Sequence, residues 1–270
     1  MPDCQRMLPL VVCFLLIMCW FPTTSLAVDE TVLTVTASSG AKLRTLLNGN
    51  PQTARANLIL LTGGNGVLKI SGKGQIKKPS DNFLVRSRLL FARAGFLTAL
   101  VDAPMDRRKK PGLLAGFRAS KAHAADLAKV VKALYALNSK PVIVIGTSRG
   151  SVSALNIAQR VHTANLRAAV LTASITKRNK RGKTINDIPL HGIKIPLLFV
   201  HNKKDKCKVT PLKGVRRSID RLKKSRVGTD LIVVTSQDSK GRSCGGLSPH
   251  GFLGIEKPVV KKIIQWINGL

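Results

Sequence analysis

The sequence predicts an α/β fold, a doubly wound and mostly parallel sheet with helices on both faces. Short apolar runs alternate with stretches of helical periodicity along the chain, which is typical of repeated β-α-β units. Most of the apolar runs lack polar alternation, as expected of strands that are covered on both faces. The chain has 270 residues, and 44% of them are hydrophobic, which is enough for one large core.

The expected strands follow one another at regular intervals. The first, 31–37, alternates polar and apolar residues and is expected at an edge of the sheet. The others are mostly apolar or β-branched, and in chain order they are 57–62, 96–101, 141–145, 166–172, 195–201 and 231–235. The strand 57–62 runs into a glycine-rich turn over 63–66. These strands define the expected sheet.

Helical periodicity separates most of the strands. The predicted helices are 82–94, 120–138, 150–161 and 259–267. Ser80 or Asp81 can cap the first of them. The apolar face of the second consists of Ala124, Leu127, Val131, Leu134 and Leu137. The basic stretch 173–194 is expected to be a loop with at most one short helix. No shift in composition marks a boundary, so 28–270 is predicted to be a single domain.

Residues 1–27 have the pattern of a signal peptide for export. Arg6 precedes an apolar run over 8–21, and Ser25 and Ala27 supply the small residues that a signal peptidase needs. The run is shorter than the roughly 20 residues of a membrane-spanning helix, so a retained anchor is the lesser alternative. The mature protein is therefore expected to be periplasmic or secreted.

The remaining composition points to a basic surface and to one pair of cysteines. Lys and Arg total 45 against 13 Asp and Glu, a formal net charge of +32. Such a surface favours electrostatic association with acidic envelope polymers or lipid head groups, although a merely solvated basic face explains it equally well. No motif for specific nucleic-acid recognition accompanies the charge. After export only Cys207 and Cys244 remain, and in an oxidising compartment two cysteines usually pair; two free buried thiols are the alternative.

The strongest local motif is Gly-Thr-Ser-Arg-Gly at 146–150. An apolar strand, 142–145, runs directly into it, and a predicted helix runs directly out. A serine on such a sharp turn is strained and exposed, and small residues two positions before and after it let the backbone pass its neighbours. Ser148 is therefore a candidate nucleophile. The alternative is a glycine-rich turn with a capping serine.

In this motif and its flanking elements the chain resembles the α/β-hydrolase family. The resemblance extends over about residues 31–267. The resemblance implies a nucleophile, an acid and a histidine in that chain order. Asp205 follows the strand 195–200 and matches the acid loop, and His250 lies in 248–252 and matches the histidine loop. His250 would act as the base for Ser148, while Asp205 orients the imidazole.

Other residues compete for these roles. Asp187 and Asp238 are rivals for the acid. The other histidines, which are more simply surface or packing residues, are His123 and His162 within helices and His191 and His201 beside a strand. For the oxyanion hole the resemblance implies the amide of Arg149 and one from Gly64 or Asn65; the family often has His-Gly at this turn, where this chain has Thr-Gly-Gly. No spacing suggests a cofactor or a metal.

These observations predict a serine hydrolase that cleaves an ester, thioester or related acyl bond through an acyl-enzyme. A carboxylesterase-like activity is favoured over a peptidase, and a catalytically silent, basic envelope-binding protein is the alternative from another class. The substrate is expected to be a small molecule, because no long insertion supplies a large lid. Arg149, Lys203, Lys204 and Lys206 suggest tolerance for an anionic substrate. A Cys207–Cys244 bridge would tie the acid loop to the histidine loop.

Overall fold

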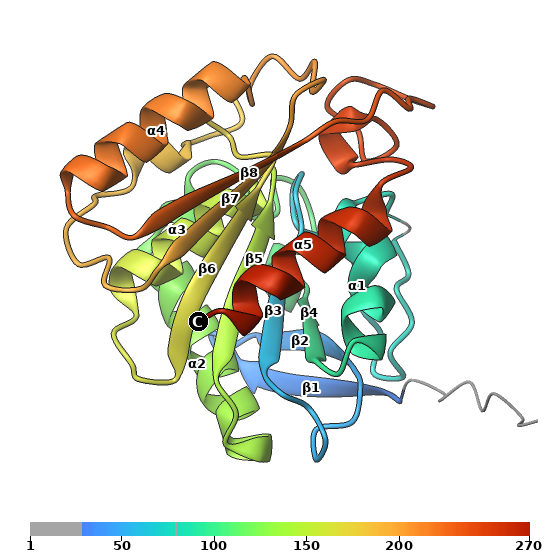
Figure 1. Cartoon of the computed structure of the whole chain (residues 1–270). Helices are drawn as coiled ribbons and strands as arrows, with labels where there is room; N and C mark the ends of the chain where they lie inside the picture. Colours follow the sequence, from blue (N-terminus) through green and yellow to red (C-terminus); the bar gives the residue numbers. More distant parts are fainter. Residues whose placement is uncertain (1–28, 79) are drawn as a thin grey trace, which may run out of the picture.

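A computed structural model describes residues 29–78 and 80–270 (Figure 1). The expected signal peptide, 1–27, lies outside these residues. One sheet runs through the molecule in the order β1-β2-β4-β3-β5-β6-β7-β8. Its strands are β1 (Glu30–Thr36), β2 (Lys42–Asn48), β3 (Asn57–Leu61), β4 (Leu97–Val101), β5 (Val142–Thr147), β6 (Leu166–Thr172), β7 (Leu197–Asn202) and β8 (Thr229–Val234).

The pairing makes the sheet mostly parallel. β1 pairs with β2, and β2 with β4, in antiparallel fashion, whereas all pairs from β4 through β3 to β8 are parallel. The predicted fold class is therefore confirmed. The carboxyl ends of β3, β5, β6, β7 and β8 consequently meet at one edge of the sheet, and loops that leave these strands lie close together.

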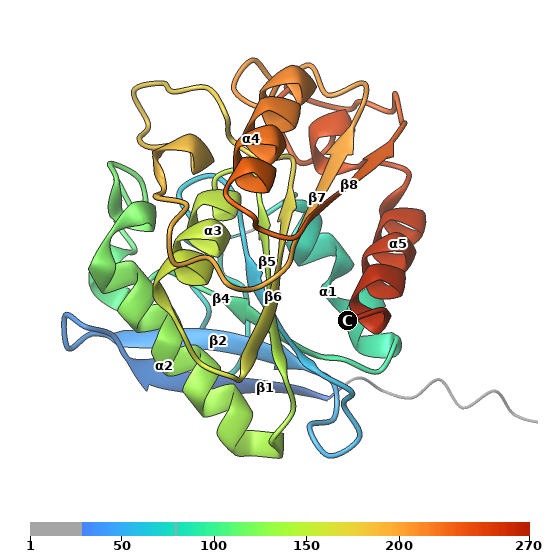
Figure 2. The ribbon, with the colours of Figure 1, turned by 60° about the vertical axis from the view of Figure 1, so that its left-hand side comes forward.

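Helices cover both faces of this sheet. They are α1 (Phe83–Arg93), α2 (Lys121–Asn138), α3 (Gly150–Arg160), α4 (Leu212–Lys224) and α5 (Glu256–Asn268). Figure 2 shows α2 and α3 on one side of the sheet and α1 and α5 on the other. Alternate residues of β3 enter the two cores, Ile59 and Leu61 with α2 and α3, and Leu58 and Leu60 with α1 and α5. This double burial explains why the residues of β3 are apolar from Leu58 to Leu61.

Several local predictions were wrong. The N-cap of α1 is Asn82, whose side chain accepts a hydrogen bond from the Leu84 amide, and neither Ser80 nor Asp81 has this role. Leu137 on α2 is 41% exposed, because the helix extends past the sheet at that end. His162 lies beyond the end of α3 rather than within it.

Two elements were not predicted, the strand β2 and the helix α4. β2 completes the antiparallel edge of the sheet, and α4 follows the loop after β7. Within residues 29–78 and 80–270, no helix combines the length and the apolar character that a bilayer crossing requires.

Candidate active site

Ser148 occupies a strained turn at the carboxyl edge of the sheet, between β5 and α3. Its φ is +52°, in the left-handed region that non-glycine residues seldom adopt. A Cβ atom on Gly146 would lie 2.2 Å from the carbonyl oxygen of Gly150, and one on Gly150 would lie 2.0 Å from that of Leu61. The motif therefore needs glycine at both positions, because the turn packs backbone against backbone. Ser148 itself is only partly buried.

Asp205 and His250 form a hydrogen-bonded pair from two separate loops. His250 Nδ1 lies 2.9 Å from Asp205 Oδ2, and the Asp205 side chain is 1% exposed. The same Oδ2 accepts a hydrogen bond from Thr210 Oγ1 at 2.8 Å, and Oδ1 accepts one from the Cys207 amide at 2.8 Å. The Ser248 hydroxyl accepts the His250 amide at 3.2 Å and fixes the start of the histidine turn. The carboxylate and the imidazole are thus held in one orientation.

The rival acids lie elsewhere. Asp187 is bonded to Arg178 and caps a short turn in the basic loop, and this contact with Arg178 lowers the pKa of Asp187 to about 2. The Asp238 carboxylate lies against the backbone of Gly254, where a Cβ atom would approach it to 2.1 Å. Of the predicted acids, only Asp205 bonds to His250.

The second imidazole nitrogen of His250 is free. Among the residues that the structure describes, buried Nε2 has no hydrogen-bond partner, and no hydrogen bond joins it to the Ser148 hydroxyl. The structure therefore brings together the acid and the histidine as a bonded pair, and it leaves the serine unbonded at the same edge of the sheet.

His201, at the end of β7, lies behind the acid. Its Nε2 is 3.9 Å from Asp205 Oδ2, and the side chain is 1% exposed. Burial lowers the pKa of His201 to about 4, despite the attraction of the Asp205 carboxylate, so its imidazole is neutral near pH 7. Because His201 is neutral, it does not compete with His250 for an ion pair with Asp205.

Two turns at this edge offer free backbone amides. Over the described residues, the amides of Arg149, Gly64 and Asn65 have no hydrogen-bond partner within the protein. Gly64 has φ +58°, which glycine adopts without strain. A Cβ atom on the preceding residue, Gly63, would lie 3.0 Å from Ser148 Cβ, so the turn after β3 packs directly against the nucleophile. This arrangement can supply an oxyanion hole.

The buried guanidinium of Arg118 holds the turn after β3, a role that no pattern in the sequence indicates. Its Nη2 donates to the carbonyl oxygens of Thr62 at 2.9 Å, Gly64 at 3.2 Å and Gly63 at 3.4 Å. Its Nη1 donates to Ser153 Oγ on α3 at 2.9 Å. Because carbonyls and amides of a turn point in opposing directions, fixing the carbonyls orients the free amides.

Among the described residues, Arg118 forms no salt bridge with a carboxylate. Arg118 is 5% exposed, and burial together with nearby Arg149 lowers its pKa to about 9, which still leaves it charged at neutral pH. Ser153 also bonds to His123 Nε2 at 2.9 Å. Burial, with Arg118 beside it, lowers the pKa of His123 to about 3, so this imidazole is neutral. A buried positive charge therefore lies under the candidate oxyanion hole.

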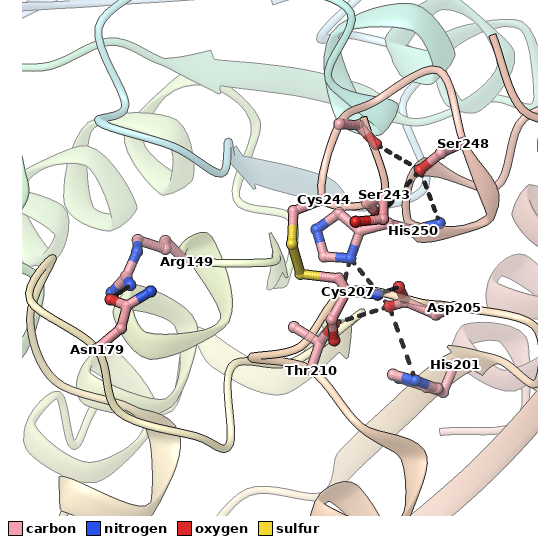
Figure 3. The surroundings of a disulfide bond; sticks show 11 residues. Arg149, Asn179, His201, Asp205, Cys207, Thr210, Ser243, Cys244, Ser248 and His250 are labelled. Atoms are coloured by element: carbon pink, nitrogen blue, oxygen red, sulfur yellow. Dashed lines mark hydrogen bonds and ion pairs between the residues drawn. A yellow bond between two sulfur atoms is a disulfide. The ribbon is translucent and has the colours of Figure 1, made fainter. Parts of the chain in front are cut away.

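A disulfide between Cys207 and Cys244 connects the acid loop to the histidine loop, and Figure 3 shows it beside the His250 ring. Within the described chain one group has the spacing of a metal site, namely Asp205, Cys207 and His250, whose ligand atoms lie within 4.8 Å of one another. A sulfur in a disulfide is not a thiolate and is a poor metal ligand. The geometry fits a brace for the pair rather than a metal centre.

A cavity of about 490 Å³ opens at this edge. Its walls are the turn after β3, the segment before α1 and the loop before His250, and it includes Gly63, which contacts Ser148. A second cavity, of about 500 Å³, lies at the opposite edge, near the first residues of β3 and β5. Only the first is next to the candidate nucleophile.

The four basic residues noted in the sequence do not line this cavity. Lys203, Lys204 and Lys206 are exposed on the acid loop. The guanidinium of Arg149 is directed to Asn179 and is 6% exposed, and burial and Arg181 lower its pKa. Figure 3 shows it on the far side of the disulfide from Asp205.

The chain is similar over most of its length to solved structures of hydrolases. An esterase from Pyrococcus furiosus, Pf2001, has a TM-score of 0.63 at 15% identity, with 96% of each chain covered. XC6422 from Xanthomonas campestris, a serine hydrolase without a lid, has a TM-score of 0.55 at 14% identity, covering 90% of this chain and 96% of that one. This chain has the α/β-hydrolase fold.

The same α/β-hydrolase fold also occurs in a protein with a peptidase name. A candidate dipeptidyl aminopeptidase IV from Bacteroides ovatus has a TM-score of 0.64 at 13% identity, and the match covers 90% of this chain but 36% of that one. No protein-family model and no curated protein matches the sequence. At these identities the likeness establishes the architecture, and the activity has to be argued from the site.

Proposed function

We propose that this protein is a serine hydrolase that cleaves a small ester, thioester or related acyl bond through an acyl-enzyme on Ser148. The observation that carries the proposal is the buried Asp205–His250 pair, with 2.9 Å between Oδ2 and Nδ1 and a free Nε2, at the sheet edge that also holds the strained Ser148. An acceptor on Nδ1 fixes the tautomer in which Nε2 can take a proton.

The proposed reaction has two halves. The Ser148 oxygen attacks the carbonyl carbon while its proton passes to His250 Nε2, and the resulting oxyanion is stabilised by the amides of Arg149 and of Gly64 or Asn65. The C–O or C–S bond breaks as His250 returns the proton to the leaving group. A water molecule then attacks the acyl-enzyme with His250 again as base, which releases the acid and restores Ser148.

The first step requires contact that is absent from this structure. The proposed mechanism requires that substrate binding bring the Ser148 hydroxyl to Nε2, and catalytic hydrogen bonds commonly tighten only in the substrate complex. A buried Nε2 without a partner is costly, which favours such a contact whenever a hydroxyl is offered.

We also propose that the mature protein works in an oxidising compartment outside the cytoplasm. The bridge between Cys207 and Cys244 supports this, because such bonds persist mainly in exported proteins.

Pre-steady-state kinetics test the proposal. With p-nitrophenyl esters of increasing acyl length, we expect a burst of nitrophenol close to one equivalent per protein, followed by slower turnover. Ser148→Ala should abolish both phases, whereas Ser225→Ala, at the exposed end of α4, should change neither. Turnover that survives Ser148→Ala would contradict the acyl-enzyme mechanism, and absence of any burst or turnover would favour a silent binding protein.

A further inference from the structure

The cavity beside Ser148 has a distinctive charge. Three cations line it, Lys78, Lys240 and Arg242, against one carboxylate, Asp81. In the part of the chain that the structure describes, none of these cations forms a salt bridge. The cavity therefore concentrates unneutralised positive charge in a concave site, where the field is stronger than on an open surface.

Lys78 is attached to the candidate oxyanion turn. Its Nζ donates to the side-chain oxygen of Asn65 at 3.0 Å, and the residue is half-buried. An ammonium group at this position lies beside the amides that would receive the oxyanion. An anionic group on a bound substrate would therefore meet Lys78 close to the scissile carbonyl.

Asn82 adds a neutral donor to the same wall. Its Oδ1 accepts the Leu84 amide as the N-cap of α1, so its NH₂ group must face away from the helix. A point at the Cβ position of Gly63 lies 3.2 Å from Asn82 Nδ2 and 3.0 Å from Ser148 Cβ. The Asn82 amide thus lies close to Gly63, the residue of the turn that packs against Ser148.

The walls of the cavity are fixed. Arg86 donates to the carbonyl oxygens of Asp81 at 2.9 Å, Gly246 at 2.9 Å and Gly251 at 2.8 Å, which fastens the segment before α1 to the histidine loop. The disulfide at Cys244 holds the same loop from the other side. The backbone of these two walls is thus held in place before a ligand binds, which lowers the cost of binding, while Lys240 and Arg242 are exposed residues of the wall that Cys244 anchors.

We propose that this cavity binds a negatively charged group of the substrate, a carboxylate or a phosphate, through Lys78, Lys240 and Arg242, so that the enzyme prefers anionic esters to neutral ones. The inference rests on the proposed hydrolase function. It assigns the substrate preference to residues other than the basic ones around Asp205, which lie outside the cavity.

Matched ester pairs test this substrate class. In the first pair the leaving group is a hydroxynitrobenzoic acid or its neutral carboxamide, and in the second a carboxylate or a carboxamide ends the acyl chain. We expect kcat/KM, corrected for the reactivity of each ester with hydroxide, to favour the acid of at least one pair by about 10-fold or more at low salt. The preference should shrink in about 0.5 M salt, where the Debye length is only a few ångström.

Neutralising variants locate the preference. Lys240→Gln and Arg242→Gln should each lower the ratio of kcat/KM for the acid to kcat/KM for the amide by about 5- to 10-fold. Lys223→Gln and Lys224→Gln remove the same charge from the far end of α4 and should change neither substrate. Arg242→Lys should retain part of the preference.

The outcomes separate the two proposals. If the neutral amide is hydrolysed with Ser148 required, but acid and amide of both pairs react alike, the anionic cavity is wrong and the hydrolase stands. The cavity is also wrong if the α4 variants lower the preference as much as the cavity variants do, because the net charge alone would then explain it. If no ester of either pair is hydrolysed, both proposals fail.

Discussion

Replacing Arg118 with methionine would remove every hydrogen bond that its guanidinium makes to the turn after β3 and to Ser153. Hydrogen bonds from a charged donor contribute about 1.5–3 kcal/mol each, so the two shortest contacts, both 2.9 Å, stabilise the fold by roughly 3–6 kcal/mol. Against this, burial lowers the pKa of Arg118 to about 9, which corresponds to a cost on the order of 5 kcal/mol for the charged form. The two effects nearly cancel, so we expect only a modest loss of stability.

Activity should respond much more strongly than stability. With the carbonyls of Thr62, Gly63 and Gly64 released, the neighbouring amides lose their fixed direction, and loss of one oxyanion donor costs about 10²–10³ in kcat. Arg118→Met should therefore lower kcat about 100-fold on a neutral ester with little change in KM. Arg118→Lys should recover only part of this, because one ammonium cannot span Ser153 and the turn together.

The assay compares kcat and KM with the folded fraction measured by denaturant unfolding. Arg55→Met is the matched control, because Arg55 stacks 4.7 Å from the Phe96 ring at the opposite edge of the sheet. If the loss of kcat in Arg118→Met is no greater than the loss of folded protein, or if it equals that in Arg55→Met, Arg118 has no positioning role.

The disulfide, His201 and Gly150 can each be tested by a separate change. The Cys207–Cys244 bridge joins residues 37 positions apart, so its reduction should lower the free energy of unfolding by about 4 kcal/mol in the chain-entropy model. In a reductant titration, activity should be lost before the protein unfolds. Loss of activity and of folded structure at the same reductant concentration would refute this. Burial lowers the pKa of His201 to about 4, so between about pH 6.5 and 4 the unfolded chain binds a proton that the folded chain does not, and the free energy of unfolding should fall as the pH drops. His201→Gln should make this pH dependence less steep in unfolding measurements. An unchanged slope would exclude a contribution from His201. Gly150→Ala would place Cβ 2.0 Å from the Leu61 carbonyl and should destabilise the fold by more than about 2 kcal/mol in thermal unfolding, whereas an unaltered Tm would show that the turn can relax.

Much of the architecture was predictable because the central strands and the turn at Ser148 follow local sequence rules. β3, β5 and β6 are buried on both faces, so their apolar runs were unambiguous. The turn at Ser148 was predictable because close backbone contacts require glycine at 146, against Gly150, and at 150, against Leu61, so that the motif stands out in the sequence. Asp205 and His250 were predictable from their places after strands.

The elements that were not predicted have weaker local patterns. β2 carries Lys42 and Arg44 near the edge of the sheet and reads as a basic loop. In α4, Val215, Ile219 and Leu222 face the core at helical spacing, but Gly214 interrupts the helix propensity. Gly214 is there because a Cβ atom would approach Thr176 Oγ1 to 2.2 Å, a constraint from a segment far away in the sequence.

The supporting residues of the site could not be predicted for the same reason. Arg118 bonds to carbonyls more than 50 positions earlier in the chain, and nothing near it distinguishes it from the many exposed basic residues. Thr210 and His201 act on Asp205 only because the loop after β7 folds back upon itself. A buried, bonded side chain becomes recognisable only once the strands are in register.

The proposed mechanism depends most directly on Ser148 acting as a nucleophile with His250 as its base. A fluorophosphonate that phosphonylates activated serines, followed by mass mapping of the peptides, measures both properties at once. We expect one adduct per protein, on Ser148, forming at least about 100-fold more slowly in His250→Gln. An adduct on another residue would contradict the role of Ser148 as nucleophile. Labelling of Ser148 at the same rate in His250→Gln as in the protein without this substitution would contradict the role of His250 as base.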